Sequence, residues 1–234
     1  MNLKEKINGI VFGIKFSKSF RIPDVAGEVI DDILYNEKSP FGKKYFPKIS
    51  VRTFERILHN PETGEYLRIN TDDIIFGIVV NKNFDEKYNW IKNEVFKYLS
   101  DHLFKKYNIK YIKRFGIVFN HEIEKGQNFV NAIKTLTNHQ IEDVENIILS
   151  FSKKSVSTDG ILRKNVKDYR NTNYTFEEVE SSLFASLDYQ YYFEPIVEDL
   201  RECSTDKILD NAKSFLEQHY YKWLIQCYDK NESR

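Results

Sequence analysis

The pattern of apolar and polar residues predicts several strands and one short helix in the first eighty positions. Residues Gly9–Phe16 predict a first strand, and apolar residues at helical spacing then predict a helix from Asp24 to about Tyr35. Ile49–Leu58 and Glu65–Asn70 are expected to form a strand and its return strand across a turn that contains Pro and Gly. Ile74–Val80 is a nearly continuous apolar run, which is typical of a buried central strand.

The clearest helix and the clearest strand follow each other directly. Apolar residues recur every three or four positions from Asn83 or Asp85 to about Tyr107, which predicts a long helix. Tyr107–Ile123 then reads as a strand, whereas Asn36–Pro47, with two prolines and no periodicity, is predicted to be a loop. The order β-α-β-β-β-α-β predicts an α+β fold, with helices on one face of a mostly antiparallel sheet.

The second half of the chain has a weaker pattern that favours strands and a long terminal helix. The expected elements are a short helix over Asn128–Thr137, a strand over Asn146–Lys153, a polar loop over Ser155–Arg170, a strand pair over Tyr174–Glu180 and Leu183–Phe193, and a helix from Ser204 or Thr205 to about Tyr228. We therefore predict a first α+β half at 1–124 and a second half at 125–234 packed against it. One continuous domain is the alternative.

Charge is distributed unevenly along a chain whose formal net charge is zero. Residues 1–120 hold 21 basic and 15 acidic side chains, a net of +6, and residues 121–234 hold 14 basic and 20 acidic side chains, a net of −6. This asymmetry favours two electrostatically complementary halves, or two complementary copies, over the steering of a polyanion to one half.

Several classes of protein are disfavoured by what the 234 residues lack. The longest apolar runs fall short of eighteen residues, so no membrane span is predicted, and the first residues read as a strand rather than a signal peptide. Cys203 and Cys227 do not form a CxxC pair, which favours free buried thiols in a cytoplasmic protein. The sequence contains no phosphate-binding glycine loop and no HExxH, so neither a cofactor nor a metal is predicted.

Three short segments resemble a family of uncharacterised, sporadically distributed bacterial proteins of about 250 residues. The family has a central RxGxRYIN strand, a later LDxDxY-like strand and a terminal amphipathic helix. Arg114-Phe115-Gly116-Ile117 is similar to the first motif, Leu187-Asp188-Tyr189 with Tyr191 to the second, and Ala212–Trp223 to the helix. This chain departs from the first motif at Val118 and His121.

The resemblance implies an α+β fold with related β-α segments in the two halves, and it implies no reaction. The patchy distribution of the family suggests mobile genes, such as those of defence or toxin–antitoxin modules.

His121, Asp188 and Arg114 are the candidates for catalysis. His121 ends the central strand and would act as a general base if Asp188 approached it from a neighbouring strand. The alternative interpretation is a polar strand end, with Asp188 in a structural ion pair with Arg114 or Lys113 because an unpaired buried carboxylate is costly.

Two basic clusters, interleaved in part with aromatic residues, are candidates for phosphate contact and base stacking on single-stranded nucleic acid. Solvated loops have the same composition. The residues concerned are Lys43, Lys44, Lys48 and Arg52 in one cluster and Lys153, Lys154, Arg163 and Lys164 in the other.

Taken together, these features favour a non-catalytic bacterial or phage protein that binds a macromolecule. A protein partner, or a second copy of the chain, is the favoured occupant, and an accessory role in a mobile defence or toxin–antitoxin module is consistent with the family resemblance. The alternative is a single-stranded RNA- or DNA-binding protein, or a metal-independent RNase-like effector with His121 as its base.

Overall fold

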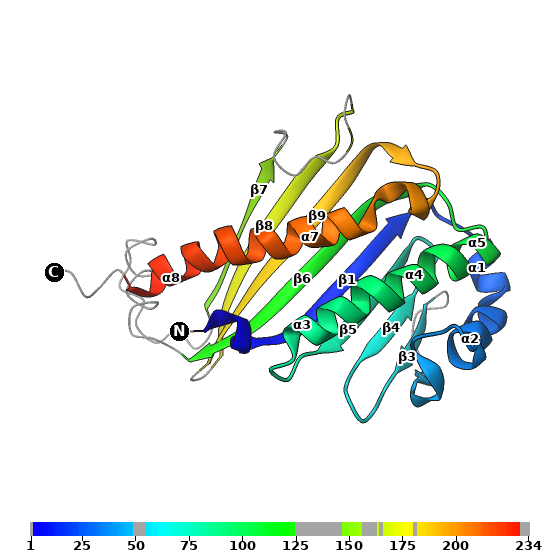
Figure 1. The fold of residues 1–234 in the computed structure, drawn as a ribbon, viewed down its shortest axis with the longest axis horizontal. Helices are drawn as coiled ribbons and strands as arrows, with labels where there is room; N and C mark the ends of the chain where they lie inside the picture. Colours follow the sequence, from blue (N-terminus) through cyan, green and yellow to red (C-terminus); the bar gives the residue numbers. More distant parts are fainter. Residues whose placement is uncertain are drawn as a thin grey trace.

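A single curved sheet carries the fold in the computed structural model, which describes residues 2–48, 55–124, 147–155, 163, 166–179 and 182–229. Within these residues the sheet has nine antiparallel strands in the order β2-β3-β4-β5-β1-β6-β9-β8-β7 (Figure 1). The predicted α+β class, with helices on a mostly antiparallel sheet, is confirmed. The strands are β1 (Ile7–Phe16), β2 (Phe46–Lys48), β3 (Arg56–His59), β4 (Tyr66–Ile69), β5 (Asp73–Val79), β6 (Ile112–Glu124), β7 (Ile147–Ser155), β8 (Tyr169–Val179) and β9 (Ser182–Val197).

Two long helices cross one side of the sheet. The first comprises α3 (Phe84–Trp90), α4 (Phe96–Tyr98) and α5 (Phe104–Lys106), joined by two π-helical turns. The second comprises α7 (Thr205–Phe215) and α8 (Tyr221–Asp229), joined by a third π-helical turn. Neither these nor any other helix in the described part of the chain is both long and apolar enough to cross a membrane.

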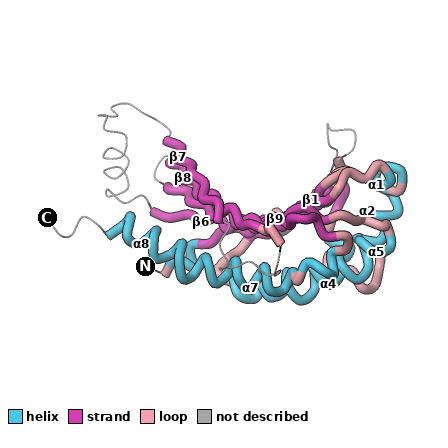
Figure 2. The backbone as a smooth tube through the Cα atoms, turned by 90° about the horizontal axis from the view of Figure 1, so that it is seen from above, coloured by secondary structure: helices cyan, strands magenta, loops and turns pink. Residues whose placement is uncertain are grey.

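Among the described residues, no helix covers the opposite side of the sheet. Figure 2 shows both long helices on one side, while the sheet curves so that its other side is concave. The short helices α1 (Arg21–Asp24) and α2 (Ala26–Tyr35) lie at the end of the molecule near α5. We call the side without a described helix the concave face.

Alternation along the central strands separates a buried apolar face from a face that is less buried. In β1, Ile10, Phe12 and Ile14 are buried, while the residues between them are half-buried. Phe12 meets Phe76 of β5 and Phe96 of the first long helix, with ring centroids 5.4 and 4.7 Å apart. Large aromatic side chains bury much apolar area, so these contacts fix the helix layer on the sheet.

A hydrogen bond between the two long helices completes this layer. The buried hydroxyl of Tyr88, in α3, donates to the backbone carbonyl of Leu209, in α7, at 2.6 Å. Lys92 and Asp210 add an ion pair of 2.6 Å on the same two helices. The two long helices therefore contact each other as well as the sheet.

The strand β2 corrects the predicted loop over Asn36–Pro47. β2 is an edge strand of three residues, and Pro47 at its centre lacks the N–H that an interior strand would need. The proline made this segment look like a loop in the sequence, because proline is tolerated in an edge strand but not in an interior strand. Of the predicted strand over Ile49–Leu58, the part from Arg56 belongs to β3, and residues 49–54 lie outside the described residues.

In the second half, the long predicted loop ends earlier than expected. Tyr169 and Arg170 already belong to β8, where they pair with Tyr192 and Tyr191 of β9. The helix predicted over Asn128–Thr137 lies outside the described residues.

Gly77 provides a test of packing on the concave face. A Cβ atom at this position would lie 2.2 Å from the ring of Tyr66 on the neighbouring strand β4, so the ring covers the glycine. We expect Gly77→Ala to lower the free energy of unfolding by about 1–3 kcal/mol, because the ring must move. Urea denaturation measures the change.

The matched control is Gly27→Ala in α2, where an added Cβ meets nothing within 4 Å. Alanine is the better helix former, so this change is expected to stabilise the protein by up to about 1 kcal/mol. In a Tyr66→Ala background the cost of Gly77→Ala should largely disappear. An undiminished cost there would show that the ring is not its cause.

Candidate functional site

A ladder of polar side chains lies on the concave face along β9. Leu187, Tyr189 and Tyr191 are buried against the helix layer, so the alternate residues Asp188 and Gln190 point to the concave face. The register places these positions opposite polar residues of β8 on one side. The pairs are Tyr192 with Tyr169, Gln190 with Asn171, Asp188 with Asn173, and Ser186 with Thr175.

Hydrogen bonds connect this ladder into a chain. Arg114 of β6 donates to the hydroxyl of Tyr192 at 3.2 Å and to Gln190 Oε1 at 3.3 Å. The Tyr192 hydroxyl donates to the same Gln190 oxygen at 2.6 Å. Gln190 Nε2 in turn donates to Asp188, whose Oδ2 also accepts from Asn173 Nδ2 at 3.0 Å. These bonds hold the polar side chains in one arrangement before any ligand arrives.

Two tyrosine rings stack within the same ladder. The rings of Tyr169 and Tyr192 are 4.5 Å apart and nearly parallel, with an angle of 7°. Lys154 Nζ lies 3.9 Å from the centre of the Tyr169 ring, and the Arg114 guanidinium carbon lies 5.6 Å from that of Tyr192. A cation therefore flanks the stacked pair on each side, which is a favourable arrangement for the ring quadrupoles. The ring faces are engaged by one another and by these cations.

Asp188 is held in place by donors rather than by a direct ion pair. Burial raises the pKa of its carboxyl group above the usual range, while the bonds from Asn173 and Gln190 and the charge of Arg114 act in the opposite direction. Arg114 thus reaches Asp188 through Gln190. The predicted direct ion pair of Asp188 with Arg114 or Lys113 is therefore not formed, because Gln190 lies between Arg114 and the carboxylate.

Glycines remove side chains from the centre of the concave face. Gly13 of β1 stands directly opposite Gly116 of β6. A Cβ atom at Gly116 would make ordinary van der Waals contact with Gln190 at 3.7 Å, whereas a Cβ atom at Gly13 would lie 3.3 Å from the Ile75 side chain. Such a pair lets another backbone approach the sheet closely.

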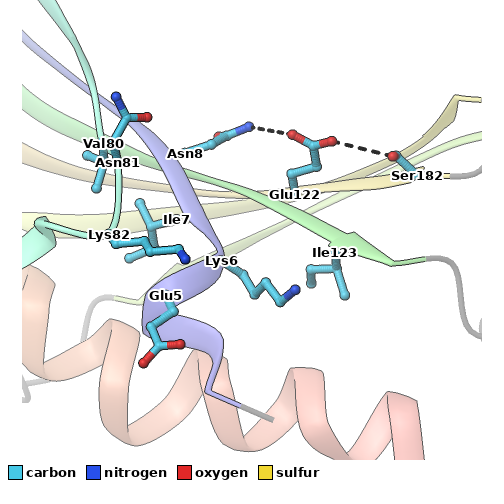
Figure 3. Close-up of a pocket in the computed structure, with 10 residues that line it drawn as sticks. All are labelled: Glu5, Lys6, Ile7, Asn8, Val80, Asn81, Lys82, Glu122, Ile123 and Ser182. Carbon is cyan, nitrogen blue, oxygen red and sulfur yellow. Dashed lines mark hydrogen bonds between the residues drawn. The ribbon is translucent and has the colours of Figure 1, made fainter.

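A groove continues the polar ladder to the end of the sheet. Its outer part is a cavity of about 440 Å³, whose lining residues are Glu5, Lys6, Ile7, Asn8, Val80, Asn81, Lys82, Glu122, Ile123 and Ser182. Figure 3 shows Glu122 between Asn8 and Ser182, each of which donates to its carboxylate at 3.4 Å. Asn8 also lines a second cavity of about 310 Å³, together with Asn120, His121, Thr175, Glu177, Phe184, Ala185 and Ser186.

The ladder and the groove form one strip, which we call the polar strip, from Tyr192 to Glu122. Its two ends differ in charge. Arg114 and Lys154 flank the tyrosine end, whereas the exposed carboxylates of Glu122 and Glu177 lie at the groove end, where Lys6 and Lys82 line the same cavity as Glu122. Between them the side chains are mainly uncharged amides and hydroxyls. The strip offers many hydrogen bonds, a basic tyrosine end and a groove end that contains both carboxylates and lysines.

The structure does not bring His121 and Asp188 together. His121 is fully buried on the helix side, where its Nδ1 lies 3.3 Å from the Ala185 carbonyl and its ring lies 5.5 Å from that of Tyr220. Asp188 points to the other face of the sheet. Burial lowers the pKa of His121 to about 4, so the imidazole stays neutral and inaccessible to a substrate on the concave face.

The two predicted basic clusters occupy opposite edges of the sheet. Lys44 and Lys48 are exposed beside or within the edge strand β2, and Lys153 and Lys154 are exposed on the other edge strand, β7. Arg52, Lys164 and the side chain of Lys43 lie outside the described residues. The described lysines therefore do not form one continuous basic surface.

Arg163, the remaining member of the second cluster, has a structural partner. Its Nε donates to Asp168 Oδ2 at 2.8 Å, and its Nη2 donates to the carbonyl of Pro195 at 2.6 Å. The Asp168 side chain is fully buried and also accepts from the Tyr191 hydroxyl and the Glu194 N–H. Arg163 compensates this buried carboxylate.

Cys203 is a free thiol that is buried in the protein. Burial raises the pKa of Cys203 well above its usual value, which keeps the group protonated and unreactive. The side chain of Cys227 lies outside the described residues. Within the part of the chain that the structure describes, no cluster of His, Cys, Asp and Glu is suited to holding a metal ion.

The prediction from sequence missed most of the polar strip. Gln190, Tyr192, Tyr169 and Asn173 were not among the predicted site residues, although Arg114 and Asp188 were. The available signal was the alternation of buried aromatic residues with polar ones in Leu187–Tyr192, which resembles a strand with a polar outer face.

Comparisons with known proteins give no family. No family model matches the chain, and no curated protein matches it. Among solved structures, Methanococcus jannaschii TBP is similar over 89% of this chain and 98% of its own, with 12% sequence identity and a TM-score of 0.30. A likeness at this level carries no functional inference.

His121 should make the stability of the protein depend on pH. Its folded pKa of about 4 lies below the ordinary value of 6.5, so the unfolded chain binds a proton first as the pH falls. The contribution of neutral His121 to the free energy of unfolding is fully present above pH 6.5. It is lost progressively towards pH 4, by about 3 kcal/mol at most. His121→Phe should flatten the urea-denaturation profile in this window.

The control variant is His219→Gln, at an exposed position on the second long helix. A pH profile that keeps its slope in His121→Phe would contradict the assignment of this loss to His121.

Arg163 is expected to stabilise the fold rather than to hold phosphate. Arg163→Ala leaves the buried carboxylate of Asp168 without its cation and should cost about 3–5 kcal/mol in urea denaturation. Lys48→Ala, at an exposed position, should change stability by less than about 0.5 kcal/mol. Unchanged stability in Arg163→Ala, with weaker binding to RNA, would restore the predicted phosphate contact.

Proposed function

We propose that this protein is a non-catalytic binding protein whose concave face holds an extended segment of a protein partner. The observation that carries the proposal is the polar strip, in which amides, hydroxyls and the half-buried carboxylate of Asp188 are linked by hydrogen bonds on the face that no described helix covers. Preorganised polar groups lower the entropic cost of binding a flexible ligand.

The chemistry of the strip suits a polypeptide. Asn171, Asn173 and Gln190 offer donors and acceptors of the kind that pair with peptide groups. The glycine pair of Gly13 and Gly116 allows the partner's backbone to approach the sheet at its centre. The expected ligand is therefore an extended chain that lies along β9.

The charges at the two ends favour a protein over nucleic acid. A nucleic acid strand carries phosphates at regular intervals, so some of them would lie beside Glu122 and Glu177. The rings of Tyr169 and Tyr192 stack on each other and have a cation near each, so a base could stack on Tyr169 only if the exposed Lys154 side chain moved away. A peptide with acidic residues at one end and basic residues at the other meets both ends favourably.

The family resemblance suggests where to look for the partner. Genes of mobile defence or toxin–antitoxin modules are commonly transcribed together. The proteins encoded by genes adjacent to this one are therefore the first candidate partners. Overlapping peptides from these products, and a random peptide library, are suitable probes.

Reversing charge at the groove end provides the test. The wild-type protein is expected to select peptides with acidic residues towards Arg114 and basic residues towards Glu122. In Glu122→Lys with Glu177→Lys, binding of the selected peptides should weaken by about tenfold, because two attractive contacts become repulsive. Fluorescence anisotropy measures the affinity of the selected peptides. If the wild-type protein selects no peptide from these sources, the proposal is contradicted.

The matched control is Glu94→Lys, which makes the same change at an exposed position of the helix layer. Affinity should be unchanged in this variant. Single-stranded RNA and DNA oligonucleotides serve as competing ligands at low salt. If they bind, with an affinity that falls steeply with salt, while the peptides do not, nucleic acid is the true ligand.

A further inference from the structure

The two edges of the sheet differ in how they are protected. Strand β2 has three residues with Pro47 at its centre, which is a common way to block further pairing. Strand β7 has nine residues and contains no proline, and no described strand lies on its outer side. A long open edge of this kind is a template for another strand.

Strand β7 also exposes apolar side chains. Ile148 is 66% exposed and Phe151 is 40% exposed, although both belong to the largest sheet in the molecule. The two residues lie on opposite faces of the strand, with Ile148 on the concave face and Phe151 beside Trp223 of the helix layer, their ring centroids 5.5 Å apart. Pairing at this edge would cover part of both side chains.

One hydrogen bond indicates which backbone groups point outward. Thr172 Oγ1 of β8 donates to the backbone carbonyl of Lys153 at 3.3 Å, so that carbonyl points towards β8. In an antiparallel ladder the alternate residues point their N–H and C=O groups the other way. The outward residues are Ile148, Ser150, Ser152 and Lys154.

We propose that a second copy of this chain pairs with β7 in antiparallel orientation, about a two-fold axis at Phe151. This register pairs outward residues with outward residues, as the ladder requires: Ile148 with the partner's Lys154, and Ser150 with the partner's Ser152. It also uses all nine residues of each strand. A centre elsewhere in the strand would shorten the overlap.

Charge complementarity favours a second copy as the occupant. The strand is apolar in its first part and ends in Lys153 and Lys154. Antiparallel pairing separates the lysines of the two copies, whereas parallel pairing in register would place them side by side. Ile148 stands next to Glu177 across β8, so Lys154 of one copy reaches towards the partner's Glu177 over the partner's Ile148.

The register makes a specific prediction at position 148. Ile148→Lys would place a lysine opposite the partner's Lys154 at two symmetric sites, which should raise the dimer dissociation constant about tenfold. Ile148→Glu would place a carboxylate there, and the dissociation constant should stay unchanged or fall. Because this side chain is largely exposed, both variants are expected to fold.

Sedimentation equilibrium of the full chain over a range of concentrations measures this constant. Adding Lys154→Glu to Ile148→Lys should restore dimerisation, since the opposite charges are exchanged. Ser150→Pro, which removes an outward N–H but not a bond to β8, should abolish the dimer. A wild-type monomer at all concentrations, or equal effects of Ile148→Lys and Ile148→Glu, would overturn the proposal.

Discussion

The backbone pairing of β6 on both of its sides is the constraint on which the rest of the structure depends. Gly9–Lys15 of β1 pairs with one edge of β6, and Ser182–Tyr192 of β9 pairs with the other. Because neighbouring residues of a strand face opposite sides, this single register decides which residues enter the helix layer. Phe115, Ile117 and Phe119 are buried as a result, and Arg114 and Asn120 face the concave side.

The same register explains why two candidate residues have different environments. His121 follows the buried series of β6 and therefore enters the helix layer beside Tyr220. Arg114 belongs to the alternate series and joins the polar strip. Asp188 is opposite Val118 and so shares the face of Arg114. A candidate pair of residues on adjacent strands can act together only if both belong to the same series.

The sequence predicted the elements better than it predicted the site. Long periodic segments such as the first long helix were recognised, because many residues repeat one signal. The strand predicted over Tyr107–Ile123 begins only at Ile112, because Tyr107 still caps the helix. The strand β2 was missed since three residues around Pro47 give no periodicity. The polar strip depends on contacts between β6, β8 and β9, and pairing between segments so far apart in the chain leaves no local pattern to read.

The blocked edge at Pro47 has a consequence for assembly. A molecule whose sheet could be extended at both edges would add copies without end and form fibres. Among the described strands, β7 has the length and the outward backbone groups for extension, while β2 has three described residues with a proline at its centre. If two copies pair through β7, the outer edges of the combined sheet are two β2 strands, and Pro47 opposes the addition of a third copy at either of them.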